Sequence, residues 1–172
     1  SSGKINIAEK GAFWVEITTY GKTAHGAFPN EGVNAVIHMN ALISEILSYR
    51  FKYEENPIIG HPTMNISTIR GGVKTNVVPD KCSITIDMRT VPGMKHSEII
   101  KDFEKLILKL SEEIKGFKAD IRILNNRAAV ETKKTHPFIK LAQETYKEVF
   151  GVDTEPQGVA FYTDASIFLP AK

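Results

Sequence analysis

The strongest constraint on the fold is the alternation of apolar and polar side chains along residues 81–91. Apolar residues occupy every second position, namely Cys82, Ile84, Ile86 and Met88, and polar residues lie between them. A period of two is typical of a strand with one buried face. The same period appears in residues 13–17, 64–66 and 119–123. The sequence therefore predicts four strands, each polar on one face.

Two segments between these strands have apolar residues at helical spacing. The first carries Val36, Met39, Ile43, Ile46 and Leu47, and the second carries Ile99, Phe103, Leu106, Leu110 and Ile114. Spacings of three and four residues predict helices with one apolar face. Ser97 is the expected N-cap of the second helix, because serine hydroxyls accept hydrogen bonds from the first turn.

The resulting order, β-α-β-β-α-β across residues 11–126, describes a ferredoxin-like α+β sandwich. Its antiparallel four-stranded sheet is covered on one face by two helices. In this topology the second strand, residues 63–70, lies at a sheet edge. An edge strand without proline is available for pairing with another chain.

The pattern changes after Asn126. A connector leads to a helix over about residues 136–150, and a final segment contains the sequence "GVAFYTDASIF". One helix and one strand are too short to bury a core. We therefore divide the chain into a domain at 1–126 and a partial second domain at 127–172.

Charge and cysteine content exclude several classes of protein. The formal net charge is +2, which provides no strong field for binding nucleic acid or an anionic membrane. The single cysteine, Cys82, cannot form an intramolecular disulfide. No apolar run has membrane-spanning length. These properties favour a cytoplasmic protein.

A histidine lies in the connector "YGKTAHGAFPNEG" at residues 20–32, between the first strand and the first helix. Glycines allow tight backbone paths here, and Pro29 stops the strand. His25 is therefore expected on a structured turn. The sequence alone also fits a loop histidine that bonds to the backbone or to solvent.

A second group of polar residues lies in "IRGGVKTNVVPDKCSITIDMRT" at residues 69–90. It includes Asn76 after a Gly-Gly turn and Arg89 on the polar face of the third strand. An arginine in this position is commonly a solvated charge, so neither residue identifies a function alone.

In combination, the motifs "G-x-x-AHG-x-x-P-x-x-G-x-NA", "GG-x-x-x-N-V-V-P" and "D-x-R", followed by "YTDASIF", are specific. They resemble the M20 family of metal-dependent peptidases and deacylases, in the group of acetylornithine deacetylase and succinyl-diaminopimelate desuccinylase. The resemblance covers nearly the whole chain. It implies a dimerisation and lid domain, followed by a short part of the catalytic domain.

The resemblance also implies roles for individual residues. In proteins similar to this one, the histidine at the position of His25 reaches the partner subunit's active site and stabilises the oxyanion of the tetrahedral intermediate. Asn76 and Arg89 correspond to substrate-contacting groups, and the arginine would pair with a substrate carboxylate. Thr163 and Asp164 are candidate pocket residues, although Asp164 also fits a turn or helix cap.

Such enzymes bind two metal ions, zinc or cobalt, but their ligand motifs are absent from this sequence. No metal ligand is therefore predicted here, and the fragment itself is expected to be inactive. The resemblance implies that the intact parent removes an acyl group from a small N-acyl amino acid. It implies a homodimer joined through strand 63–70 and helix 33–50.

Two other interpretations fit parts of the sequence. The segment "KGAFWVEI" is similar to an RNA-recognition strand, but that signature belongs on the third strand, and "CSITIDMRT" contains no aromatic residue. A free-standing amino-acid-binding regulatory domain fits the sandwich, although it does not account for the C-terminal segment. The sequence does not identify the acyl group.

Overall fold

The computed structural model describes residues 4–168 of the 172-residue chain. Its elements are β1 (Asn6–Glu9), β2 (Gly11–Tyr20), the 3-10 turn η1 (Pro29–Glu31), α1 (Ala35–Ser48), β3 (Thr63–Gly71), β4 (Lys81–Thr90), α2 (His96–Glu113), β5 (Lys118–Arg127), β6 (Val130–Glu131), α3 (Pro137–Phe150), β7 (Gln157–Val159) and α4 (Ala165–Phe168). Within these described residues, no helix is long and apolar enough to cross a membrane.

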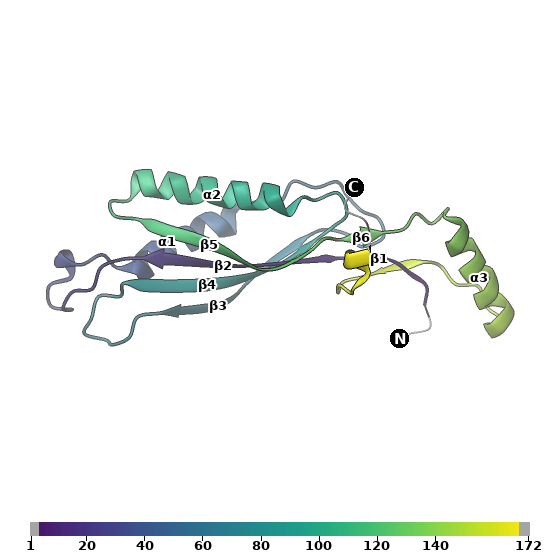
Figure 1. Ribbon diagram of the computed structural model, residues 1–172, viewed down its shortest axis with the longest axis horizontal. Coiled ribbons are helices and arrows are strands. Elements are labelled where there is room, and N and C mark those ends of the chain that lie inside the picture. Colours follow the sequence, from purple (N-terminus) through teal and green to yellow (C-terminus); the bar gives the residue numbers. More distant parts are fainter. Residues whose placement is uncertain (1–3, 169–172) are drawn as a thin grey trace.

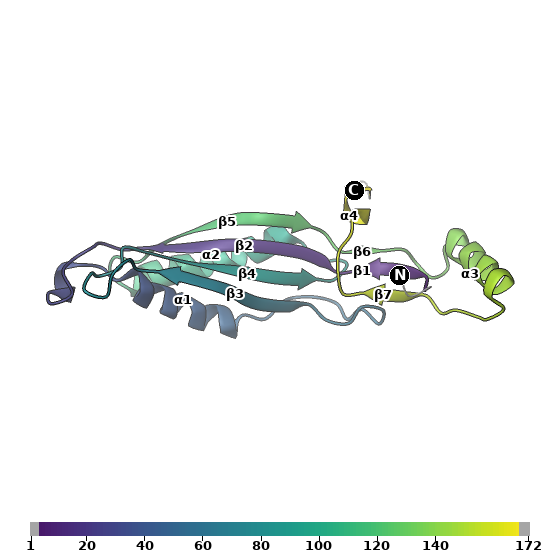
Figure 2. The ribbon, with the colours of Figure 1, turned by 90° about the horizontal axis from the view of Figure 1, so that it is seen from below.

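The larger sheet has the strand order β3-β4-β2-β5, and all neighbouring strands are antiparallel. Figures 1 and 2 show α1 and α2 on one face of this sheet, while the other face is open. The arrangement confirms the predicted ferredoxin-like α+β sandwich. It also confirms that β3 lies at an edge, where it pairs with β4.

The core lies between the sheet and the two helices. The register places apolar residues of β2 and β4 opposite one another, in the pairs Phe13–Met88, Val15–Ile86 and Ile17–Ile84. All six side chains are at most 1% exposed. Because fully burying one such side chain contributes about 1.5–3 kcal/mol, a one-residue slip of register would be strongly unfavourable.

The start of α2 differs from the prediction that Ser97 caps the helix. Helix α2 begins at His96, and its N-cap is Lys95, which makes no side-chain cap hydrogen bond. The imidazole of His96 is buried and stacks on Phe13 at a centroid distance of 4.3 Å. Burial of this ring fixes the start of the helix two residues earlier than a Ser97 cap would allow.

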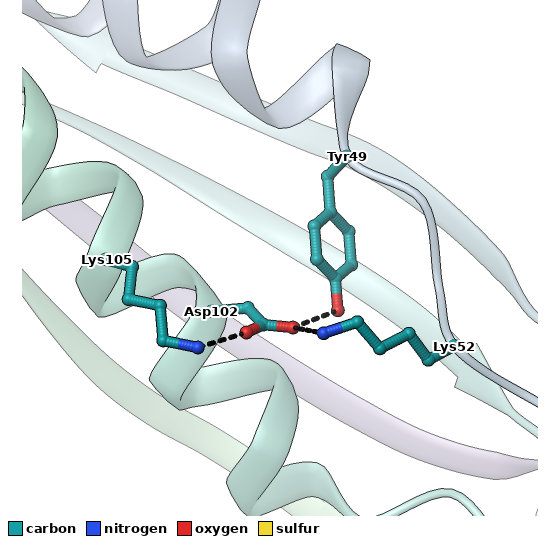
Figure 3. A network of polar contacts seen from close by, with 4 residues as sticks. All are labelled: Tyr49, Lys52, Asp102 and Lys105. Carbon is teal, nitrogen blue, oxygen red and sulfur yellow. Dashed lines mark hydrogen bonds and ion pairs between the residues drawn. The ribbon is translucent and has the colours of Figure 1, made fainter.

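A polar network joins the C-terminal end of α1 to α2 (Figure 3). Asp102 accepts from Lys105 at 2.9 Å, and its other oxygen lies 3.4 Å from Lys52 and 3.5 Å from the hydroxyl of Tyr49. The hydrogen bond from Lys105 lowers the pKa of Asp102. Burial, followed by the charge of Asp102, raises the pKa of Tyr49 to about 12. The phenol therefore acts as a donor to a carboxylate at neutral pH.

A smaller sheet contains a strand that the sequence did not indicate. The central strand β1 pairs antiparallel with β6 and parallel with β7, in the order β6-β1-β7. It therefore joins residues from the beginning of the chain to the C-terminal segment. The four residues of β1 are too few to show a recognisable period. The molecule is elongated, with the small sheet and α3 at one end (Figures 1 and 2).

Candidate functional site

The loops at the far end of the larger sheet bring His25 beside Asn76. The N–H of Gly26 donates to the carbonyl of Asn76 at 2.8 Å, and the N–H of Val78 donates to the carbonyl of Ala24 at 2.9 Å. His25 also forms an isolated antiparallel bridge with Val77. The two motifs that the sequence singled out, separated by about fifty residues, therefore form one surface, which we call the tip.

One ring nitrogen of His25 is already hydrogen-bonded to the backbone. Its Nδ1 atom accepts a hydrogen bond from the backbone N–H of Ala27 at 3.1 Å. A neutral imidazole that accepts at Nδ1 carries its proton on Nε2. The side chain is exposed. The turn thus presents an N–H donor at the tip, and it fixes the tautomer through a local backbone contact.

Two glycines of the tip lie close to neighbouring backbone atoms. A Cβ atom on Gly21 would lie 2.0 Å from the carbonyl oxygen of Val33, and one on Gly26 would lie 3.2 Å from the carbonyl oxygen of Asn76. A side chain at Gly21 would displace the backbone that leads to His25, whereas a Cβ at Gly26 would require the neighbouring backbone to move by only a few tenths of an ångström. The close approach of the Val33 carbonyl is therefore the physical reason for glycine at position 21.

An open groove of about 580 Å³ lies along the tip between the two loops. Its lining includes Pro29, Asn34, Val73, Lys74, Thr75 and Pro79. The side chain of Asn34 is occupied as the N-cap of α1, because it accepts from the N–H groups of Val36 and Ile37. Asn76 is exposed next to this groove.

Arg89 lies far from the tip. It is eight positions along β4 from Lys81, which at about 3.3 Å per residue corresponds to roughly 26 Å. Its guanidinium pairs with Asp87 at 2.8 Å, and its Cζ atom lies 6.0 Å from the ring centre of Tyr162. The structure therefore does not bring Arg89 together with His25 and Asn76 within one chain.

Thr163 lies near Arg89, at the junction between the two sheets. Its hydroxyl donates to Glu9 at 2.6 Å and accepts from the N–H of Ala165 at 3.1 Å. The carbonyl of Asp164 accepts from the N–H of Ile167 at 2.8 Å, and its side chain is exposed. The five predicted site residues thus form two groups, one at the tip and one at the junction.

Sequence reasoning did not single out three residues of the junction group. Glu9 is 5% exposed, and Trp14 and Tyr162 contact each other edge to face at a centroid distance of 6.3 Å. A glutamate at the end of a short apolar segment and an aromatic residue on a polar sheet face are weak signals. Only the fold brings Trp14 against Tyr162 and Glu9 against Thr163.

The described residues do not provide a metal site. Within residues 4–168 there is no group of three or more His, Cys, Asp or Glu residues that could hold a metal ion. The paired glutamates Glu54 and Glu55 are exposed in the connector between α1 and β3. The side chains within residues 4–168 therefore do not fit a two-metal centre.

The chain is similar in sequence and in fold to known proteins. Residues 7–115 match the family model of the M20 peptidase dimerisation domain. The chain is 24% identical over 163 residues to acetylornithine deacetylase of Myxococcus xanthus, which covers 92% of this chain and 41% of that protein. It is 32% identical over 117 residues to acetylornithine deacetylase of Buchnera aphidicola, covering 63% of this chain and 31% of that protein.

Solved structures share the fold. A tripeptidase from Staphylococcus aureus superposes with a TM-score of 0.75 at 23% identity, covering 96% of this chain and 42% of that chain. An M20 family metallo-carboxypeptidase from Sulfolobus solfataricus superposes with a TM-score of 0.74 at 19% identity, covering 97% of this chain and 49% of that chain. In each comparison the chain spans less than half the length of its relative.

Proposed function

Because the chain belongs to the M20 peptidase dimerisation domain family, we propose that it forms the dimerisation and lid portion of a metal-dependent amidohydrolase. The parent enzyme removes an acyl group from a small N-acyl amino acid, of the acetylornithine or succinyl-diaminopimelate type. The acetylornithine deacetylases among the similar proteins support this substrate class. We place the enzyme in the cytoplasm, and we assign residues 1–126 to the lid and 127–172 to the catalytic domain.

The observation that carries the proposal is the fixed donor of His25 at the tip. The hydrogen bond from the N–H of Ala27 to Nδ1 leaves Nε2–H free on an exposed side chain. The tip lies roughly 26 Å along β4 from the junction group, at about 3.3 Å per residue. This separation supports the proposal that the donor acts on a neighbouring subunit.

In the partner's active site, the Nε2–H of His25 would donate to the oxyanion that develops on the substrate carbonyl. A preorganised donor aimed at developing charge binds the transition state more strongly than the substrate. Loss of one such donor typically reduces kcat by about a hundredfold to a thousandfold. Asn76, from the same tip, would contact the substrate in the same active site.

Arg89, Thr163 and Asp164 would contact the substrate from the junction. The guanidinium of Arg89 pairs with Asp87 through one of its nitrogens, and its further N–H groups are suited to a substrate carboxylate. Two zinc or cobalt ions would be held by residues of the parent that this sequence does not include. The chemistry that such ions supply in hydrolases is Lewis-acid catalysis.

The proposed dimer surface consists of the edge strand β3 and the adjacent helix α1, within residues 33–50 and 63–70. It carries four exposed large apolar residues: Val36, Ile37, Leu47 and Ile69. Pairing of two β3 edges about a two-fold axis would join two sheets and bring the α1 helices together. The same symmetry would direct each tip towards the other subunit.

The His25→Ala variant of the parent enzyme tests the proposal. We expect kcat to fall about a hundredfold or more with a small change in KM, because the interaction is made mainly in the transition state. The matched control is His61→Ala, which alters an exposed histidine outside the tip. Equal and near-normal kinetics for both variants would show that His25 is an ordinary turn histidine.

A further inference from the structure

Residues 161–164 cross the junction between the two sheets and contact both of them. Tyr162 lies against the open face of the larger sheet, with Trp14 at 6.3 Å and Arg89 at 6.0 Å from its ring centre. The next residue, Thr163, donates to Glu9 of the smaller sheet at 2.6 Å. Two consecutive side chains therefore hold opposite sides of the junction. We call residues 161–164 the strap.

On the larger sheet, the strap contacts a connected polar group. Asp87 accepts from the indole Nε1–H of Trp14 at 2.9 Å and from the guanidinium of Arg89 at 2.8 Å. Tyr162 packs on the two donors that Asp87 orients. The position of the Arg89 guanidinium is therefore fixed by an anion in its own strand and by an aromatic ring from the strap.

On the smaller sheet, the strap is held by a buried carboxylate. Glu9 is 5% exposed and lies two residues before Gly11, where the chain passes from β1 into β2. The passage is tight, because a Cβ on Gly11 would lie 2.3 Å from the hydroxyl oxygen of Thr90. Contact with Glu9 therefore fixes Thr163 to the segment that joins the sheets.

We propose that Tyr162 and Glu9 are positioning residues that hold the strap across the junction, and so fix both the angle between the two sheets and the relative positions of Arg89 and Thr163. The effect on catalysis rests on the proposed function, in which Arg89 and Thr163 contact the substrate. The effect on the angle between the sheets is independent of the proposed function. Neither Tyr162 nor Glu9 needs to touch the substrate.

Fluorescence of the 172-residue chain tests the strap directly, because Trp14 is its only tryptophan. Tyr162→Leu should shift the Trp14 emission to the red as the indole becomes more hydrated, while Tyr162→Phe should retain the wild-type spectrum. Tyr53→Leu, at an exposed tyrosine of the α1–β3 connector, is the matched control. Identical emission from Tyr162→Leu and the wild type would overturn the proposal.

The angle between the sheets is measured with two spin labels. Cysteines replace the exposed residues Val73, at the tip, and Val149, in α3, and alanine replaces the buried Cys82. We expect one narrow distribution of distances between the two labels. Tyr162→Leu and Glu9→Ala should broaden this distribution. Glu9→Gln should preserve it, because the glutamine oxygen still accepts a hydrogen bond from Thr163. Unchanged distributions in Tyr162→Leu and Glu9→Ala would also overturn the proposal.

Kinetics of the parent enzyme test the consequence for the substrate. Tyr162→Leu and Glu9→Ala should lower kcat/KM roughly tenfold to a hundredfold, as expected for misplaced contacts, and the conservative variants Tyr162→Phe and Glu9→Gln should restore it. Normal kinetics in all four variants would exclude a positioning role. If the wild-type parent does not hydrolyse N-acyl amino acids, the proposed function fails, and the strap is still decided by the fluorescence and distance measurements.

Discussion

The Nδ1 atom of His96 lies 2.6 Å from Oδ1 of Asn126, which joins the first turn of α2 to the end of β5. An amide oxygen is only an acceptor, so Nδ1 carries the proton. Nε2 then accepts from the hydroxyl of Thr90 at 2.8 Å. The ring is buried against Phe13. Both nitrogens of the neutral imidazole are therefore satisfied, and the three strand and helix ends near the junction are held together.

The first prediction concerns the stability of this contact at mildly acidic pH. Burial lowers the pKa of His96 below its ordinary value of 6.5. At pH values between the lowered pKa of the folded state and the ordinary pKa of the unfolded state, the unfolded state binds more protons than the folded state. The free energy of unfolding therefore falls as pH falls through this range. We expect this loss to begin as pH drops below about 7, and to be smaller in His96→Gln, which cannot titrate.

Urea unfolding of the wild type and of His96→Gln from neutral to mildly acidic pH measures the difference. His61→Gln, at an exposed histidine, is the matched control variant. Parallel curves for the wild type and His96→Gln would show that burial of His96 has no effect on its titration.

The second prediction concerns the network at Asp102. Its depressed pKa stabilises the fold above the ordinary value of 3.8, and this stabilisation is lost as pH falls through the lower folded value. At neutral pH, Asp102→Asn should lower the free energy of unfolding by about 1 kcal/mol, because Lys52 and Lys105 are largely exposed. The loss should shrink on acidification.

Chemical denaturation at neutral and acidic pH checks this prediction. Tyr49→Phe is the companion variant, since it removes the long 3.5 Å contact and keeps both lysine pairs. Tyr49→Phe should lower the free energy of unfolding less than Asp102→Asn does at neutral pH. A difference between Asp102→Asn and wild type that is independent of pH would mean that the ion pairs do not stabilise the helix pair.

The sequence predicts the sheet and helices well because their patterns are long. The four strands β2, β3, β4 and β5 and the helices α1 and α2 follow from periods of two and of three to four. The first residue of α2 does not follow from these periods, because contacts of the buried His96 ring with distant residues determine where the helix begins. Local propensity alone favours Ser97.

The candidate site is predictable only in part. Motif resemblance finds His25 and Asn76, and the backbone pairing of their loops brings them together. It does not indicate that Arg89 meets Tyr162 at the other end of β4, because that contact joins residues far apart in the sequence. The contact between Glu9 and Thr163 spans 154 positions, and no local pattern encodes such a pair.

The third prediction concerns self-association through β3. Ile69 is 58% exposed at the sheet edge, so Ile69→Lys should place a charge in the proposed interface and shift a dimer towards monomer. Leu108→Lys is the matched control, since Leu108 is 59% exposed on α2, away from this edge. Light scattering over a range of protein concentrations gives the masses. A wild type that stays monomeric at high concentration would contradict the interface.

The last prediction separates action of His25 on a partner subunit from action within its own chain. Two variants of the parent enzyme, each inactive alone, are mixed in equal amounts: His25→Ala, and one that lacks a metal ligand of the catalytic domain. In a mixed dimer, the active site with intact metals belongs to the His25→Ala chain. If His25 acts across the two-fold axis, that site receives a functional histidine from its partner.

Random exchange makes half of the dimers mixed, and each mixed dimer has one complete site of two, so activity should recover to about a quarter of the wild-type value. Subunit exchange is verified by mass on differently tagged chains. A mixture of the metal-ligand variant with His61→Ala provides the reference, because His61 lies outside the tip and its chain is active alone. Absence of recovery in dimers shown to exchange would place His25 in its own chain's active site or outside catalysis. Recovery would assign the Nε2–H donor of His25 to the active site of the neighbouring subunit.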